Sequence, residues 1–149
     1  MFKYRSEKKE ILDLTDLPQV DLYRNLRELD LINRYLGGHR ISVNGLKEVL
    51  KNRNFKKIIH IADIGCGGGD SLRAFAHWSF IKDVPIRLTG IDLKQDCINF
   101  CIEHSVQYPE INFIQNDYKS VFEAAHGVDI VHAALFLSLI HISEPTRPY

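Results

Sequence analysis

The stretch "IADIGCGGGD", residues 61–70, places a carboxylate and four glycines at the end of an apolar run. Glycine adopts backbone angles that are closed to other residues and lets the chain approach a ligand closely, so Gly65, Gly67 and Gly69 predict a ligand-binding turn. Asp63 stands two residues before the first of these glycines, where its carboxylate can accept hydrogen bonds from a cationic ligand or from water bound to it. The chemistry predicted here is the binding of a flat or polar molecule against the loop.

The spacing of the glycines separates two classes of ligand. A dinucleotide-binding loop follows G-x-G-x-x-G, and counting from Gly65 and Gly67 the last position falls on Asp70. A carboxylate at that position would repel a pyrophosphate, so a ligand without phosphates is favoured. An NAD(P)-binding oxidoreductase stays open as the alternative.

Other reactive side chains give weaker signals. The three cysteines, Cys66, Cys97 and Cys101, form no CxxC pair and suit a reducing compartment. Cys97 and Cys101 lie four apart without a histidine or an acid at ligand spacing, so we expect buried thiols, and the seven histidines form no HxH or HExxH group. We therefore expect no metal site. His132 could act as a base or touch a substrate, although a histidine satisfied within the core fits the pattern at least as well.

The elements that must position these residues alternate between strands and helices after residue 54. Near-continuous apolar strands separated by helices predict an α/β fold, a Rossmann-like parallel sheet with helices on both faces. In such a sheet the ligand binds outside the carboxyl ends of the strands, where the glycine loop is expected. The expected strands are "KIIHIADI", "IRLTGID", "INFIQ" and "VDIVHAALF", and the expected helices bury Leu72, Phe75 and Ala76, then Ile98, Cys101 and Ile102, then Val121, Phe122 and Ala125.

Residues 1–54 have a different, helical pattern. An amphipathic helix is predicted over residues 18–36, ending at Gly37 and Gly38, and a second over residues 42–54 with Ser42 as its N-cap. The side chains predicted to face inward are Leu22, Leu26, Leu29 and Leu36 on the first helix, and Leu46, Val49 and Leu50 on the second.

Composition excludes several classes of partner. The chain of 149 residues has the length of one α/β domain, and its 19 basic residues balance 19 acidic ones, so no bulk positive field exists to hold a nucleic acid. No apolar run approaches a signal peptide or the roughly 20 residues of a membrane span. We expect a cytoplasmic protein with no nucleic-acid or membrane partner.

Four segments, in order, resemble the motifs of class I S-adenosylmethionine-dependent methyltransferases. "DIGCGGGD" is similar to their first motif, D/E-x-G-x-G-x-G, "LTGIDL" to the second, "FIQNDY" to the third and "VDIVHAALF" to the fourth. The resemblance spans residues 57–136. It implies S-adenosyl-L-methionine as cofactor and methyl transfer to a small-molecule acceptor, a reaction in which the enzyme mainly aligns donor and nucleophile.

The resemblance also implies a role for each matching residue. Asp92 would bind the ribose hydroxyls and Asp117 the adenine amine, although both could serve only as turn residues. The leader, residues 1–54, would pack as a lid over the cofactor-binding domain, residues 55–136. The residues implied to contact the cofactor are Asp63, Gly65, Cys66, Gly67 and Gly69 at the methionine part, Asp92 at the ribose, and Asp117 and Tyr118 at the adenine. Leu93, which follows Asp92, is also implied to contact the cofactor.

The end of the chain departs from this family, whose members continue for three more strands. Residues 137–148, "LSLIHISEPTRP", resemble the in-frame translation of a transposase sequencing adapter. We therefore expect the native sequence to end near Phe136 and residues 137–149 to be a non-native tail. On this interpretation the chain as written is a truncated, inactive fragment, and a cofactor-binding module without turnover is a further alternative.

Overall fold

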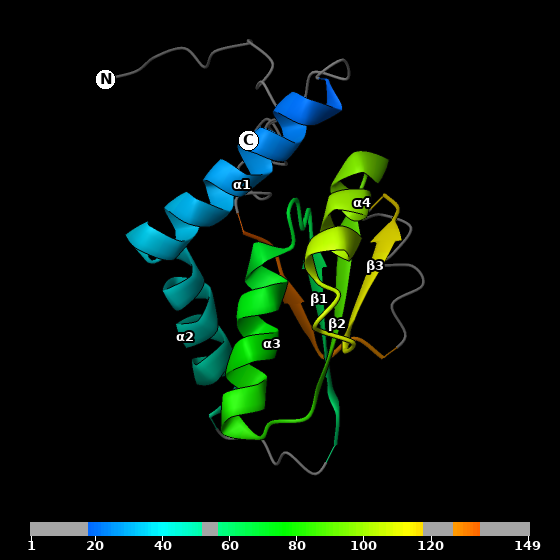
Figure 1. Ribbon diagram of the computed structural model, residues 1–149. Helices are drawn as coiled ribbons and strands as arrows, with labels where there is room; N and C mark the ends of the chain where they lie inside the picture. The colour runs from blue at the N-terminus through cyan, green and yellow to red at the C-terminus, as the bar shows by residue number, and fades with distance from the viewer. Residues whose placement is uncertain (1–17, 52–56, 118–126, 135–149) are drawn as a thin grey trace, which may run out of the picture.

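The structure, a computed structural model, describes residues 18–51, 57–117 and 127–134 (Figure 1). Its centre is a parallel sheet of four strands in the order β3-β2-β1-β4. The strands are β1 (Ile59–Ile64), β2 (Ile86–Asp92), β3 (Ile111–Gln115) and β4 (Ile130–His132). Each lies within a segment that the sequence predicts as a strand, and the predicted Rossmann-like α/β fold is confirmed.

The register of the sheet decides which side chains share a face. Ile61 pairs with Leu88, and both are fully buried in the core. Two positions later Asp63 pairs with Gly90 on β2 and with His132 on β4. Because directly paired residues of parallel strands point to the same face, Asp63 and His132 come together at the carboxyl end of the sheet.

Two helices connect the strands and pack on that face. Helix α3 (Asp70–Lys82) buries Leu72, Phe75 and Ala76, as predicted. Helix α4 (Gln95–His104) buries Ile98 and Cys101 against the same core. The third helix predicted between strands, around Val121, Phe122 and Ala125, lies outside the described residues.

Helix α4 has a second buried stripe, which packs against the leader. It consists of Cys97, which was predicted as a buried thiol, and Phe100, which was not predicted to be buried. Ile102, predicted to face inward, is 55% exposed, and that prediction is wrong. The reason is that α4 lies between two partners, the sheet and the leader, whereas the prediction assumed one.

The leader forms a helical hairpin, α1 (Gln19–Leu36) and α2 (Gly38–Leu50). Gly37 ends α1 in the left-handed conformation, with φ of 85°, and its carbonyl accepts the N–H of Ile41 at 3.0 Å, so that α2 begins immediately. Ser42, predicted as the N-cap of the second helix, therefore lies inside α2, and that prediction is wrong. A left-handed glycine can reverse the chain between two helices without a side-chain cap.

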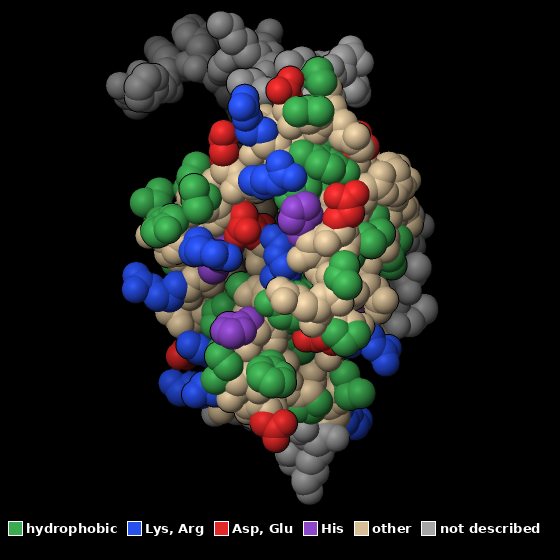
Figure 2. Space-filling model, in the orientation of Figure 1, with side chains coloured by type: hydrophobic (Ala, Val, Ile, Leu, Met, Phe, Trp, Pro, Cys, Tyr) green, Lys and Arg blue, Asp and Glu red, His purple; other side chains and the backbone are tan. Residues whose placement is uncertain are grey.

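Only part of each leader helix is buried. Leu22 and Leu26 pack against α4, and Leu46 and Leu50 join the core of the sheet. The predictions for two other side chains are wrong, since Leu36 is 80% and Val49 is 51% exposed. Exposed apolar side chains gather over the turn between α1 and α2, at the left of Figure 2. They include Leu31, Tyr35, Leu36 and Ile41.

Within the described ranges, no helix combines the length and the apolar character that a membrane crossing requires. Residues 1–17 and the segment 137–149, with the expectation that it is a non-native tail, lie outside the part of the chain that the structure describes.

Gly90 allows β2 to pack closely against its neighbours. A Cβ atom at this position would lie 2.7 Å from Leu72 Cδ1 and 2.7 Å from Phe113 Cδ1. Gly90→Ala is expected to lower the free energy of unfolding by about 1–3 kcal/mol because the core is overpacked. Gly45→Ala on α2 is the matched control, since no atom lies within 4 Å of its added methyl, and it should raise stability by about 0.5–1 kcal/mol. Urea unfolding measures both, and equal shifts would contradict the packing argument.

Candidate functional site

A cavity of about 270 Å³ opens at the carboxyl ends of the strands, between the glycine loop and α1. The ends of β1 and β2 contribute Asp63, Ile64, Ile91 and Asp92 to its wall. The loops after the strands contribute Gly65, Cys66, Gly67, Gly68, Leu93, Lys94 and Asn116, and α1 contributes Leu22, Leu26, Leu29 and Asn33. Six of the nine residues implied to contact the cofactor are in this wall: Asp63, Gly65, Cys66, Gly67, Asp92 and Leu93. The wall formed by α1 was not specified by the sequence, which indicated only that the leader would act as a lid.

Asp63 lies near the end of β1 and is 3% exposed. Its Oδ1 lies 2.7 Å from Nδ1 of His132. Burial raises the pKa of the Asp63 carboxyl, and the hydrogen bond from His132 opposes this effect. A cationic group of a ligand would offset the same burial cost, so Asp63 is suited to receive positive charge in the cavity.

Asp92 is the last residue of β2 and holds the glycine loop in place. Its Oδ2 accepts the N–H of Gly67 at 2.9 Å, and its Oδ1 accepts the N–H of Lys94 at 3.0 Å. Burial raises the pKa of the Asp92 carboxyl, and these N–H groups oppose it. A carboxylate has about four acceptor sites, so Asp92 can also accept hydrogen bonds from hydroxyl groups of a ligand.

Hydrogen bonds to the backbone of β2 and from a thiol of α4 hold the glycine loop in place. The N–H groups of Gly65 and Cys66 donate to the carbonyl of Ile91 at 2.8 Å and 3.0 Å. The Cys101 thiol donates to the carbonyl of Gly67 at 3.1 Å. The loop is therefore a rigid part of the cavity wall.

Gly69 has a packing role beneath the loop. Its φ is 71°, and a Cβ there would lie 3.0 Å from the sulfur of Cys101. It is not among the described residues that line the cavity. Its requirement for glycine comes from the turn into α3 and from the close approach of α4.

The three cysteines are buried thiols, which confirms the prediction made for Cys97 and Cys101. The hydrogen bond with Cys101, together with burial, raises the pKa of Cys66, and burial raises the pKa of Cys97 to about 12. Both groups are therefore thiols rather than thiolates at neutral pH, and neither is suited to act as a nucleophile.

After β3, the cavity wall contains Asn116 and not the predicted Asp117. Asn116 is in the cavity wall, and its backbone N–H donates to the carbonyl of Asp92 at 3.0 Å. Asp117 is exposed and is not among the described lining residues, while its own N–H donates to Oδ1 of Asn116 at 2.8 Å. Tyr118 lies outside the described residues. The one available signal for Asn116 was its place as the first residue after "INFIQ".

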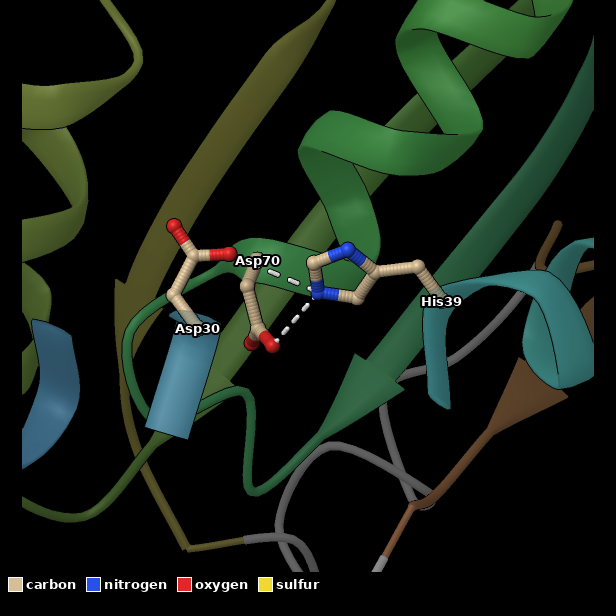
Figure 3. Close-up of side chains that lie close together, drawn as sticks. All are labelled: Asp30, His39 and Asp70. Carbon is tan, nitrogen blue, oxygen red and sulfur yellow. Dashed lines mark hydrogen bonds and ion pairs between the residues drawn. The ribbon is translucent and has the colours of Figure 1, made fainter. Parts of the chain in front are cut away.

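Asp30, His39 and the cavity-lining Asp70 form a cluster whose potential metal-ligand atoms lie within 4.8 Å of one another (Figure 3). Nε2 of His39 lies 2.9 Å from Oδ2 of Asp70 and 3.5 Å from Oδ1 of Asp30. The three residues come from α1, α2 and α3, so no sequence spacing indicated the cluster.

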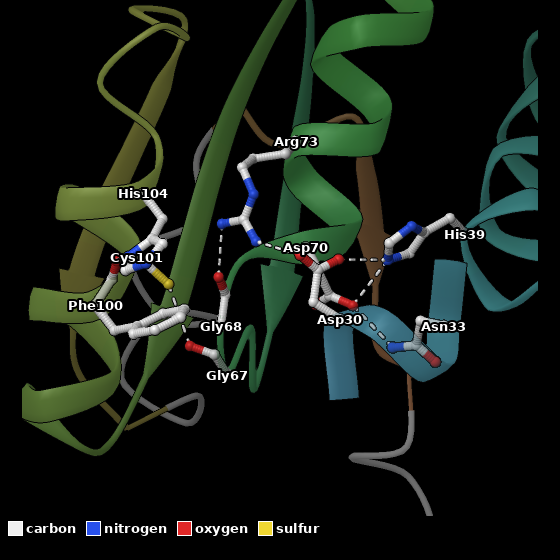
Figure 4. A network of polar contacts seen from close by, with 10 residues as sticks. All are labelled: Asp30, Asn33, His39, Gly67, Gly68, Asp70, Arg73, Phe100, Cys101 and His104. Atoms are coloured by element: carbon white, nitrogen blue, oxygen red, sulfur yellow. Dashed lines mark hydrogen bonds and ion pairs between the residues drawn. The ribbon is translucent and has the colours of Figure 1, made fainter. Parts of the chain in front are cut away.

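Cationic and N–H donor groups already face these carboxylates (Figure 4). Nη2 of Arg73 lies 3.6 Å from Oδ2 of Asp30, and Nη1 of the same guanidinium donates to the carbonyl of Gly68 at 2.7 Å. The Asn33 amide donates to Oδ2 of Asp70 at 2.8 Å. A metal ion would have to compete with this guanidinium, so the cluster is best described as a polar network that joins the leader to the glycine loop.

Asp70 should make the stability of the protein sensitive to acid. Burial alone would raise the pKa of Asp70, but the hydrogen bonds from Asn33 and His39 outweigh it and lower that pKa. A carboxyl with a lower pKa in the folded state stabilises the fold above its unfolded pKa, and that stabilisation is lost as the pH falls through the folded pKa. Asp70→Asn should thus cost on the order of 1 kcal/mol at pH 7 and flatten the decline in unfolding free energy below about pH 4. The exposed Asp83→Asn is the control in urea titrations, and parallel pH curves for Asp70→Asn and the parent would contradict the assignment.

Comparison with known proteins gives a family for this arrangement. The family described as methyltransferase domain matches residues 61–148, more than half of the chain. The mitochondrial ubiquinone biosynthesis O-methyltransferase of Saccharomyces cerevisiae is 29% identical over 90 residues, which cover 60% of this chain and 27% of that protein. The chain thus spans about a quarter of the length of the curated relative that it matches.

Solved structures share the fold. A protein from Methanococcus maripaludis assigned as an S-adenosyl-L-methionine-dependent methyltransferase superposes with a TM-score of 0.55 at 16% identity, covering 91% of this chain and 56% of that one. The bifunctional kinase-methyltransferase WbdD gives a TM-score of 0.52 at 20% identity, covering 75% of this chain and 24% of that one. At these identities the likeness concerns the fold alone.

Proposed function

Because this chain belongs to the methyltransferase domain family, we propose that it binds S-adenosyl-L-methionine in the cavity between the glycine loop and α1, as the cofactor-binding part of an enzyme that transfers the methyl group to a small-molecule acceptor. One observation carries the proposal. Two carboxylates, the buried Asp63 and the half-buried Asp92, lie at the carboxyl ends of neighbouring strands and line the same cavity as the glycine loop. This places acceptors for a cationic group and for hydroxyl groups beside one loop.

Asp92 and the residues near it would hold the nucleoside part of the cofactor. The carboxylate of Asp92 is fixed by two backbone N–H groups and would accept the ribose hydroxyls. Leu93 is 60% exposed beside the cavity and offers an apolar surface for one face of the adenine. The amide of Asn116 joins Asp117 and Tyr118 as a group proposed to contact the edge of the ring.

Asp63 would hold the opposite end of the cofactor. The methionine part carries an ammonium, which can donate charge-assisted hydrogen bonds to a buried carboxylate, and a sulfonium, whose positive charge the same carboxylate attracts. The bound cofactor supplies an activated methyl group, so little acid or base chemistry is needed. The contribution of the protein is to fix the donor against Asp63 and the loop and to exclude water.

The alternative of a dinucleotide ligand is disfavoured by Asp70. This carboxyl begins α3 and lines the cavity, and Asn33 and His39 favour its charged form. A negative charge at the N-terminus of the helix after the glycine loop opposes a pyrophosphate, which this helix end would otherwise attract.

The leader is proposed to act as the lid. Leu22, Leu26 and Leu29 on α1 form one wall of the cavity, which supports a cofactor enclosed between the leader and the sheet. The curated relative is named for O-methylation in ubiquinone biosynthesis, which supports a small organic acceptor.

Calorimetric titration tests the proposed ligand. We expect S-adenosylhomocysteine and S-adenosylmethionine to bind the chain at one site, while NADH, which shares the adenosine, binds at least about tenfold more weakly. Binding of NADH without binding of S-adenosylhomocysteine would overturn the proposal and favour the oxidoreductase alternative.

A further inference from the structure

His132 lies between the cavity carboxylate Asp63 and the leader residue Ser42. Its Nδ1 is 2.7 Å from Oδ1 of Asp63, and its Nε2 is 3.2 Å from Oγ of Ser42. The imidazole is largely buried, and its ring meets that of Phe75 edge to face with centroids 5.0 Å apart. Three elements, β1, β4 and α2, therefore meet at one side chain.

This contact follows from the register of the sheet. Asp63 and His132 are directly paired across β1 and β4, so their side chains leave the sheet on the same face. Helix α3 covers that face through Phe75, and α2 packs beside α3 through Leu46 and Leu50. The imidazole is thereby held in one orientation by packing as well as by hydrogen bonds.

The serine, histidine and carboxylate do not make a nucleophilic triad. Ser42 lies inside α2, where the surrounding backbone N–H groups belong to the helix and cannot stabilise an oxyanion. Neither Ser42 nor His132 is among the described residues that line the cavity. The hydroxyl thus has neither a substrate beside it nor the donors that acyl transfer requires.

Resting on the proposed function, we infer that His132 is a positioning residue that fixes the orientation of Asp63 toward the cationic end of the cofactor, with Ser42 anchoring the imidazole to the leader. Both ring nitrogens contact protein groups, so neither is available to take a proton from an acceptor. The carboxylate of Asp63 retains further lone pairs that can face the cavity.

The geometry requires one tautomer of the neutral imidazole. A carboxylate only accepts, so Nδ1 of His132 carries the proton and donates it to Asp63. Nε2 then accepts a hydrogen bond from the Ser42 hydroxyl. This is a spectroscopic signature that packing alone does not produce.

Three substitutions at His132 separate the hydrogen bond from the packing. His132→Asn keeps an N–H donor at the same number of bonds from the backbone as Nδ1 of histidine. His132→Phe keeps an aromatic ring against Phe75 but has no donor. His132→Ala removes both. Ser42→Ala removes only the contact to the leader.

Calorimetry with S-adenosylhomocysteine compares the variants, and thermal unfolding confirms that each is folded. We expect His132→Ala and His132→Phe to bind about tenfold more weakly, and His132→Asn to stay within about threefold of the parent chain. Ring ¹⁵N spectra of the ligand-free chain should show the Nδ1–H tautomer.

Either of two results would overturn the inference: equal affinity of the Phe and Asn variants, or an Nε2–H tautomer in the ligand-free chain. Failure of the parent chain to bind S-adenosylhomocysteine would instead overturn the proposed function, and the tautomer would still decide whether His132 donates to Asp63.

Discussion

Asp92→Ala is expected to weaken the binding of S-adenosylhomocysteine by about 100-fold, equivalent to about 2.7 kcal/mol. The substitution removes a carboxylate that would accept two ribose hydroxyls, and hydrogen bonds to charged groups contribute roughly 1.5–3 kcal/mol each. It also leaves the N–H groups of Gly67 and Lys94 without their acceptor, which loosens the glycine loop. Both effects lower the affinity for S-adenosylhomocysteine.

Asp117→Asn is the control for Asp92→Ala in the same titration. Asp117 is exposed outside the described cavity wall, and an amide oxygen can still accept from an adenine amine, so affinity should change by less than about threefold. Thermal unfolding of both variants separates a lost contact from a lost fold. If Asp92→Ala bound within about threefold of the parent chain, the ribose assignment would be incorrect.

Leu26→Ala is expected to lower the free energy of unfolding by about 2–4 kcal/mol and to loosen α1. Leu26 is 5% exposed, packs with Leu22, Cys97 and Phe100, and forms part of the cavity wall. Truncating it leaves a cavity between the leader and α4, and the affinity for S-adenosylhomocysteine should fall because one wall of the site becomes mobile.

Leu31→Ala provides the matched control on the same helix. Leu31 is 54% exposed, so its truncation should change stability by no more than about 0.5 kcal/mol. Hydrogen exchange measured separately for α1 and α3 tests the local effect. We expect Leu26→Ala to accelerate exchange in α1 well beyond that in α3. Equal acceleration in both helices would show that the leader is an inseparable part of the core and not a lid.

Local patterns in the sequence were sufficient to locate the ligand-binding end of the sheet. Apolar strands alternating with helices predicted a parallel sheet, and in a parallel sheet the carboxyl ends of the strands meet at one edge. This rule brings Asp63 and Asp92 together without knowledge of any side-chain contact. The glycine loop could be found for a similar reason, because its residues are consecutive and their backbone requirements are local.

Burial on a helix could be predicted only where its buried side chains face a single core. The stripe on α3 was correct because the sheet and α2, which both pack against this helix, share one core with Leu72 and Phe75. Helix α4 packs on both the sheet and α1, and its buried surface turned away from Ile102. A hydrophobic period gives the direction of one apolar face, and it does not give the number of surfaces that meet the helix.

Tertiary structure alone decided how the leader meets the site. His39 reaches Asp70 across 31 positions of the sequence, and His132 reaches Ser42 across 90. No residue spacing encodes such contacts, because each depends on the angle and register at which separate elements pack. The sequence by itself therefore determined the loop and its two carboxylates, whereas the packing of α1 and α2 decided which side chains close the cavity and which one orients Asp63.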